Sequence, residues 1–327
     1  MKSLNQFNNV KIVYYSGTGG TEKVANIFRE NLIKRGKEVG IEKIISKNNI
    51  DSEFNNYNHD YDCLILLFPV HSFNAPKAVY DWIKNLKDNT KKINNENINK
   101  ENKENINNEI IKDNNYKLPT IVISVSGGGE VSPNTACRVS VIKMLEDKKC
   151  NVFYEKMIVM PSNLIVPTKY PVSKMLLELL PVKIQKILDE VEKGVSRRTK
   201  PPFIDRIVSK IGELEKTSTK SFGKHIKVTE DCNLCGNCYK NCPSNNIELI
   251  DNKIKFDSKC HMCFGCFYAC PENALKPTKY KFMVIKEGYN LKETEKLESV
   301  EITKENIEKV AKGYLWKGVR EYLLKND

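Results

Sequence analysis

The chain has 327 residues, a formal net charge of +12 and 11 cysteines. This length leaves room for about two domains. No stretch approaches the ~20 apolar residues of a membrane-spanning helix, and residues 1–9 lack the apolar centre of a signal peptide. We therefore expect a cytoplasmic protein without a membrane span, in a compartment where thiols stay reduced. No nucleic-acid-binding motif accompanies the positive charge, which is compatible with ordinary solubility or with steering of an acidic protein partner.

The first predicted element is a β-rich run, Val10–Tyr15, which precedes a hydroxyl- and glycine-rich loop and a helical pattern over residues 22–35. Strand, loop and helix in this order are typical of a phosphate site, where amides, hydroxyls and the helix dipole surround the anion. The loop lacks the lysine of the P-loop and the dinucleotide fingerprint. Its candidate phosphate ligands are Ser16, Thr18, Gly19, Gly20 and Thr21. The alternative is a plain turn between a strand and a helix.

Four further segments predict strands, and helical patterns over residues 77–86 and 135–147 alternate with them. Such alternation predicts an α/β fold with a doubly wound parallel sheet. Ligands bind beyond the carboxyl ends of strands in such sheets. The strands are expected at Lys37–Ile45, Cys63–Phe68, Thr120–Ser126 and Asn151–Val159.

The rest of the chain is less informative up to residue 222. Residues 89–115 are rich in Asn, Lys, Glu and Ile, so a disordered insert is expected, although a docking arm is an alternative. Residues 166–222 contain an amphipathic helical pattern that indicates a linker and brace between two domains. The tail, residues 281–327, also has a helical stretch near its end.

A cysteine pattern occurs twice between residues 223 and 280, and each copy reads C-x2-C-x2-C-x3-C-P. This is the signature of a bacterial two-cluster ferredoxin, in which the fourth cysteine of each run ligates the cluster of the other run. One [4Fe–4S] cluster is therefore assigned to Cys232, Cys235, Cys238 and Cys270, and the other to Cys242, Cys260, Cys263 and Cys266. A disulfide framework does not suit a reducing compartment, and structural zinc typically uses two separated C-x2-C pairs.

These motifs together resemble a family of fusion proteins from anaerobic archaea and bacteria that join a flavodoxin to a two-cluster ferredoxin. The resemblance covers most of the chain and implies FMN, with its phosphate on the loop from Ser16 to Thr21. Loops after two strands would flank the isoalloxazine ring; their residues are Pro69, Val70, His71, Phe73, Asn74, Ser126, Gly127, Gly128 and Gly129. His71 fits two interpretations, a contact with the flavin ring and a solvated loop histidine.

The sequence thus predicts a flavodoxin-like domain (residues 1–165), a helical linker (166–222), a small α+β ferredoxin domain (223–280) and a helical tail. The expected function is electron transfer between FMN and two [4Fe–4S] clusters, with an unidentified redox partner protein. Two alternatives remain: a reductase of a small electron acceptor that depends on FMN and iron–sulfur clusters, and a redox subunit of a larger complex. The sequence shows no catalytic acid that would favour the reductase over an electron carrier.

Overall fold

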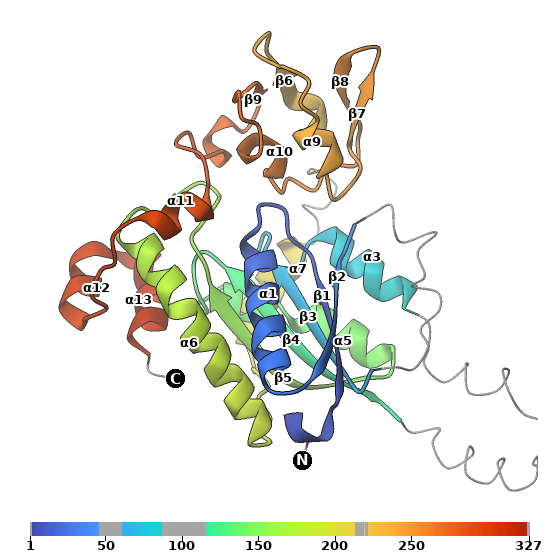
Figure 1. Cartoon of the computed structure of the whole chain (residues 1–327), viewed down its shortest axis with the longest axis vertical. Helices are drawn as coiled ribbons and strands as arrows, with labels where there is room; N and C mark the ends of the chain where they lie inside the picture. The colour runs from blue at the N-terminus through green and yellow to red at the C-terminus, as the bar shows by residue number, and fades with distance from the viewer. Residues whose placement is uncertain (1, 46–60, 87–115, 213–218, 220–221, 326–327) are drawn as a thin grey trace, which may run out of the picture.

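The computed structural model describes residues 2–45, 61–86, 116–212, 219 and 222–325. The predicted insert at 89–115 lies outside these residues. Figure 1 shows two units, a parallel sheet flanked by helices and a smaller cysteine-bearing unit above the carboxyl ends of its strands. No helix among the described residues combines the length and the apolar character that a membrane crossing requires.

The sheet has five strands in the order β2-β1-β3-β4-β5, and all neighbouring pairs are parallel. This order is that of the flavodoxin-like doubly wound fold, so the expected fold class is confirmed. Buried parallel strands read as continuous apolar runs because both faces are covered, and every residue of β4 is buried. The strands are β1 (Asn9–Tyr14), β2 (Glu38–Lys43), β3 (Cys63–Pro69), β4 (Leu118–Ser126) and β5 (Cys150–Val159).

Helices cover both faces of the sheet. On one face α3 (Lys77–Asn85) and α5 (Val139–Asp147) pack against the strands. On the other face α1 (Gly20–Lys34) and α6 (Val172–Glu192) share one core with the strands. The sequence suggested that α6 belongs to a linker, but its apolar stripe completes the core of the sheet unit.

A second helix of the suggested linker also packs on the sheet unit. Helix α7 (Phe203–Gly212) lies against η5 (Asn134–Ala136), in the connection between β4 and α5. Its Asp205 is buried and accepts a hydrogen bond from Ser132 Oγ at 2.7 Å. Because a buried carboxylate requires such partners, this contact fixes α7 over the loops at the carboxyl end of the sheet.

The cysteine-bearing unit is built from two small antiparallel pairs and two short helices. The turn between β7 and β8 contains Asp251 and Asn252, with φ of 51° and 55°, the positive values of a tight two-residue hairpin turn. Phe222, Phe264 and Phe267 form its small core. Its elements are β6 (Ile226–Val228), α9 (Asn237–Lys240), β7 (Ile247–Ile250), β8 (Lys253–Phe256), α10 (Gly265–Tyr268) and β9 (Leu275–Pro277).

The tail returns from this unit to the sheet unit (Figure 1). Val319 and Leu323 of its last helix pack with Val159 and the amino-terminal half of α6. Gly318 lies so close to the loop after β4 that a Cβ there would overlap the Gly128 carbonyl oxygen. The tail elements are η7 (Lys281–Met283), α11 (Leu291–Lys296), α12 (Lys304–Val310), η8 (Tyr314–Trp316) and α13 (Lys317–Leu324).

Candidate functional site

A cavity of about 740 Å³ lies beyond the carboxyl ends of the strands, where a doubly wound sheet binds its ligands. This volume is in the range of cofactor sites. Loops after β1, β3, β4 and β5 form its floor and sides. The remaining walls come from α7, from residues 261–264 of the second cysteine run, and from Tyr280, Met283 and Tyr289. The cavity therefore lies between the two units of the molecule.

The loop after β1 forms one end of the cavity and leads directly into α1. The Gly19 amide donates to Ser16 Oγ at 3.1 Å, which closes the loop at the start of the helix. Asn163 Nδ2 donates to Thr18 Oγ1 at 2.7 Å, so the Thr18 hydroxyl hydrogen is available to another acceptor. Ser16, Thr18, Gly20 and Thr21 line the cavity, whereas Gly19 caps the helix in the left-handed region. Free amides at this helix start favour an anion.

The loop after β3 makes a tight turn in which the backbones of His71 and Asn74 exchange two hydrogen bonds of 2.8 Å. Pro69, Val70, His71 and Phe73 line the cavity, as the sequence suggested. The Asn74 side chain instead lies in a buried contact with α7, where its Oδ1 accepts from Ser209 Oγ at 2.9 Å. Burial, followed by the charge of His261, lowers the pKa of His71 to about 4, so this imidazole is neutral at pH 7.

The loop after β4 places Ser126, Gly127 and Gly128 against the cavity, while Gly129 packs on Gly318 of α13. A buried side chain supports the loop from behind. Arg138 is 1% exposed and donates from Nε to Glu155 Oε2 at 2.6 Å and from a terminal nitrogen to Ser124 Oγ at 2.8 Å. The same guanidinium forms an ion pair with Glu130, which follows the three glycines. Arg138 is a single arginine in a helical pattern, so the sequence contained no signal that it supports the loop after β4.

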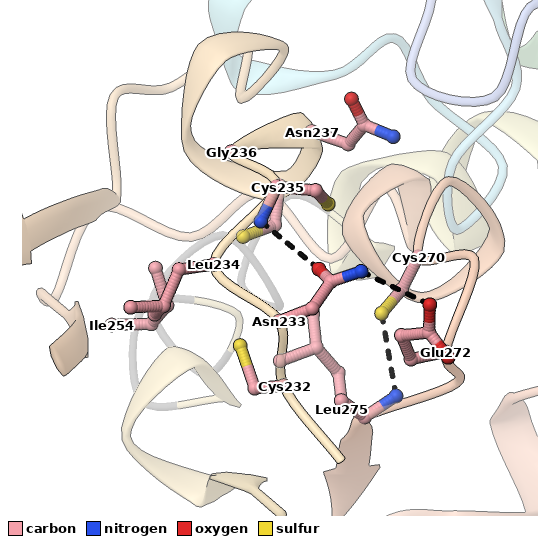
Figure 2. A pocket seen from close by; sticks show the side chains of 12 residues that line it. Cys232, Asn233, Leu234, Cys235, Gly236, Asn237, Ile254, Cys270, Glu272 and Leu275 are labelled. Atoms are coloured by element: carbon pink, nitrogen blue, oxygen red, sulfur yellow. Dashed lines mark hydrogen bonds between the residues drawn. The ribbon is translucent and has the colours of Figure 1, made fainter. Parts of the chain in front are cut away.

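The eight cysteines of the two runs line two separate pockets. Cys232, Cys235, Cys238 and Cys270 surround the first, which is drawn in Figure 2. Cys242, Cys260, Cys263 and Cys266 surround the second. Each pocket thus receives three cysteines of one run and the fourth cysteine of the other run, which is the crossed arrangement of a two-cluster ferredoxin.

Local contacts of the sulfurs suit metal-bound thiolates. The amide of Asn246 donates to Cys242 Sγ at 3.3 Å, and the amide of Ala274 donates to Cys270 Sγ at the same distance. Each donor lies four residues after its cysteine. Such bonds stabilise thiolates and are one lever on cluster potential.

The electrostatics of the second pocket call for a cationic partner. Burial, followed by the charges of neighbouring thiolates, raises the pKa of Cys266 well above its usual value. Among the described residues, no group of three or more His, Cys, Asp or Glu side chains has the arrangement of a single-ion site. A [4Fe–4S] cube binds each thiolate at a separate iron atom, and its positively charged core offsets part of their negative charge. The residues of both pockets therefore fit such a cube.

The two units meet at the wall between the large cavity and the second cysteine pocket. Cys263 lines both spaces. A Cβ atom added at Gly17 would overlap the Cβ atom of Cys263. The same added atom would lie 3.1 Å from the Cys263 sulfur. The Tyr268 hydroxyl, one turn further on, donates to the Asn163 carbonyl at 2.8 Å. Sequence reasoning missed this wall, because neither motif contains a signal for contact with the other.

Comparison with protein families shows that residues 224–271 match the model of the 4Fe-4S dicluster domain. The chain therefore joins a flavodoxin-like domain to a 4Fe-4S dicluster domain. The matched residues include all eight cysteines of the two runs, and a domain of this kind carries two [4Fe–4S] clusters. A comparison with curated proteins found no match.

Solved structures similar to the chain include several flavodoxins and one FMN complex. A flavodoxin from the domain Archaea is 9% identical, with 56% of this chain and 99% of that chain covered at a TM-score of 0.31. Flavodoxin 2 from Bacillus cereus is 14% identical, with coverages of 56% and 99% and a TM-score of 0.34. General stress protein 14 from Treponema denticola, in complex with FMN, is 8% identical, with the same coverages and a TM-score of 0.36. The fold assignment rests on the strand order of the structure itself.

Proposed function

We propose that this protein transfers electrons between an FMN in the large cavity and two [4Fe–4S] clusters in the cysteine pockets. The observation that supports this most strongly is the shared wall: one cavity has a phosphate-type loop at one end and the cluster-side residue Cys263 on another side. A flavin exchanges electrons singly or in pairs, and each cluster exchanges one. A single chain that holds both makes their exchange unimolecular.

The residues of the cavity fit FMN in kind and position. Ser16, Thr18, Gly20 and Thr21 would hold the phosphate at the start of α1, where the helix dipole favours negative charge. The turn around His71 and the glycine loop from Ser126 would flank the isoalloxazine ring. His71 would do so as a neutral imidazole.

The clusters would be ligated in the crossed pattern that the two pockets suggest. Cys270 would complete the cluster of the first run, and Cys242 would complete the cluster of the second run. The donor and acceptor are redox partner proteins in a reducing compartment, for which we propose the cytoplasm. The two alternative functions, a reductase and a subunit of a complex, would keep the same cofactors and would add an acceptor or a docking partner.

The phosphate loop provides the test of the flavin site. We expect Thr18→Ala with Thr21→Ala to weaken FMN binding by about 10²- to 10⁴-fold, because two hydrogen bonds to a charged group, each worth about 1.5–3 kcal/mol, are lost. Iron content should not change, since neither threonine lines a cysteine pocket. FMN affinity is measured by fluorescence titration under anaerobic conditions, with iron determined on the same samples.

Thr294→Ala is the matched control, because Thr294 lies on α11 and bonds only to the nearby Asn290 carbonyl. It should bind FMN like the parent protein. Equal FMN affinity in the double variant would exclude this loop from the flavin site. Tighter binding of FAD than of FMN would contradict a flavodoxin-like pocket.

A further inference from the structure

We propose that the three redox centres act in a fixed spatial order. The flavin cavity couples directly to the second-run cluster through the contact of Gly17 with Cys263. The first-run cluster exchanges electrons with an external one-electron carrier protein. This inference rests on the proposed function and adds the order of the three redox centres. The second-run cluster is the one in the pocket of Cys242, Cys260, Cys263 and Cys266.

The first observation is that only the second run reaches the flavin cavity. His261, Met262, Cys263 and Phe264 line it, and none of the lining residues comes from the first run. Gly17 belongs to the phosphate loop and touches Cys263 at both its backbone and its side chain. A flavin held by this loop would therefore have a cluster ligand in the wall of its own site.

The second observation is a difference between the two cysteine runs at equivalent positions. Gly265 precedes the third cysteine of the second run, and Asn237 precedes the third cysteine of the first run. Asn237 shows that a ferredoxin run accepts a side chain at this position. At Gly265 a Cβ would overlap the Gly17 carbonyl oxygen. Glycine at 265 is therefore required by the contact with the loop that contains Gly17.

The third observation is that the first-run pocket faces solvent. Cys235 is exposed, whereas the other seven cysteines of the runs are partly buried. Leu234 is 37% exposed and lines the first-run pocket together with Ile254 (Figure 2). Leu249, the cross-strand partner of Ile254, is 39% exposed. A small apolar patch beside an exposed redox centre suits the weak, transient interfaces of electron carriers.

The two pockets are also neighbours, so a path continues from one to the other. Cys238 of the first pocket and Cys266 of the second contact the same aromatic core around Phe264 and Phe267. The electrons balance over the three centres. A flavin that has gained two electrons can reduce both oxidised clusters by one electron each, with its protons released to water. Both electrons then leave through the first-run cluster, which reduces an oxidised one-electron carrier and is reduced again by the second-run cluster.

Gly265→Ala tests the bridge. The added methyl group should separate the loops of Gly17 and Cys263, and internal electron exchange between flavin and clusters should slow about tenfold. FMN content and iron content should equal those of the parent, because Gly265 lines neither the flavin cavity nor a cysteine pocket. Asn237→Ala, at the equivalent position of the first run, is the matched control and should leave the internal rate unchanged.

The order of the centres is tested with the double variant Cys232→Ala with Cys235→Ala, which removes the first-run cluster. Cytochrome c serves as the external one-electron carrier. We expect about four iron atoms instead of eight, internal exchange at the parent rate, and strongly slowed reduction of cytochrome c. The inference would be overturned if Gly265→Ala and Asn237→Ala had equal rates of internal electron exchange. It would also be overturned if removal of the first-run cluster abolished electron exchange between the flavin and the second-run cluster. Absence of FMN from the purified holoprotein would instead refute the proposed function.

Discussion

Replacement of Cys242 by alanine should remove the cluster of the second run, although Cys242 belongs to the first run in the sequence. The reason is geometric: the Cys242 side chain lines the pocket of Cys260, Cys263 and Cys266. Iron content should fall from about eight atoms to about four. Internal electron exchange with the flavin should be lost at the same time, because the remaining cluster lies in the pocket away from the flavin cavity.

Cys270→Ala is the matched variant and should give the complementary result. Cys270 lines the pocket of the first run, so this change should also leave about four iron atoms but preserve internal exchange with the flavin. Iron analysis and electron paramagnetic resonance of the reduced proteins identify the surviving cluster. Loss of the local cluster in each variant would contradict the crossed ligation.

A second large effect is expected at Arg138, the largest fully buried side chain of the described residues. Arg138→Met should reduce the free energy of unfolding by about 3–5 kcal/mol, because Glu155, itself buried, would lose its partner. Glu130 would also lose its ion pair next to the glycine loop, so FMN binding should weaken. The measurements are the melting temperature of the anaerobic protein and its FMN affinity.

Lys296→Met separates this effect from a general loss of positive charge. Lys296 pairs with Glu293 at the surface of α11, where both side chains are more than 60% exposed, so its removal should cost about 0–1 kcal/mol. Equal melting temperatures for the two variants would show that the Arg138 network does not support the sheet unit.

The sequence was most informative where a local pattern has a single structural solution. Apolar runs predicted β1, β3, β4 and β5, because buried parallel strands leave a hydrophobic signal, whereas no residue of the edge strand β2 is buried. The spacing of the cysteines likewise indicated which of them lie around the same pocket.

Long-range contacts were not predictable in the same way. The amphipathic pattern of α6 indicates that one face is buried but does not say against what, and the structure places that face in the core of the sheet. Asn74 looked like a flavin contact because it follows β3, yet it bonds to α7 from a distant part of the sequence. The contact of Gly17 with Gly265 depends on two single glycines in different motifs, and no periodicity marks it.

The central claim is that electrons pass between flavin and clusters within one molecule. It is tested by rapid mixing of the anaerobic holoprotein with a reductant, following the flavin and cluster absorbance over a wide range of protein concentration. We predict that internal equilibration proceeds at the same rate at every concentration. A rate that rises in proportion to protein concentration would contradict the account, because transfer would then occur between molecules and not across the wall formed by Gly17 and Cys263.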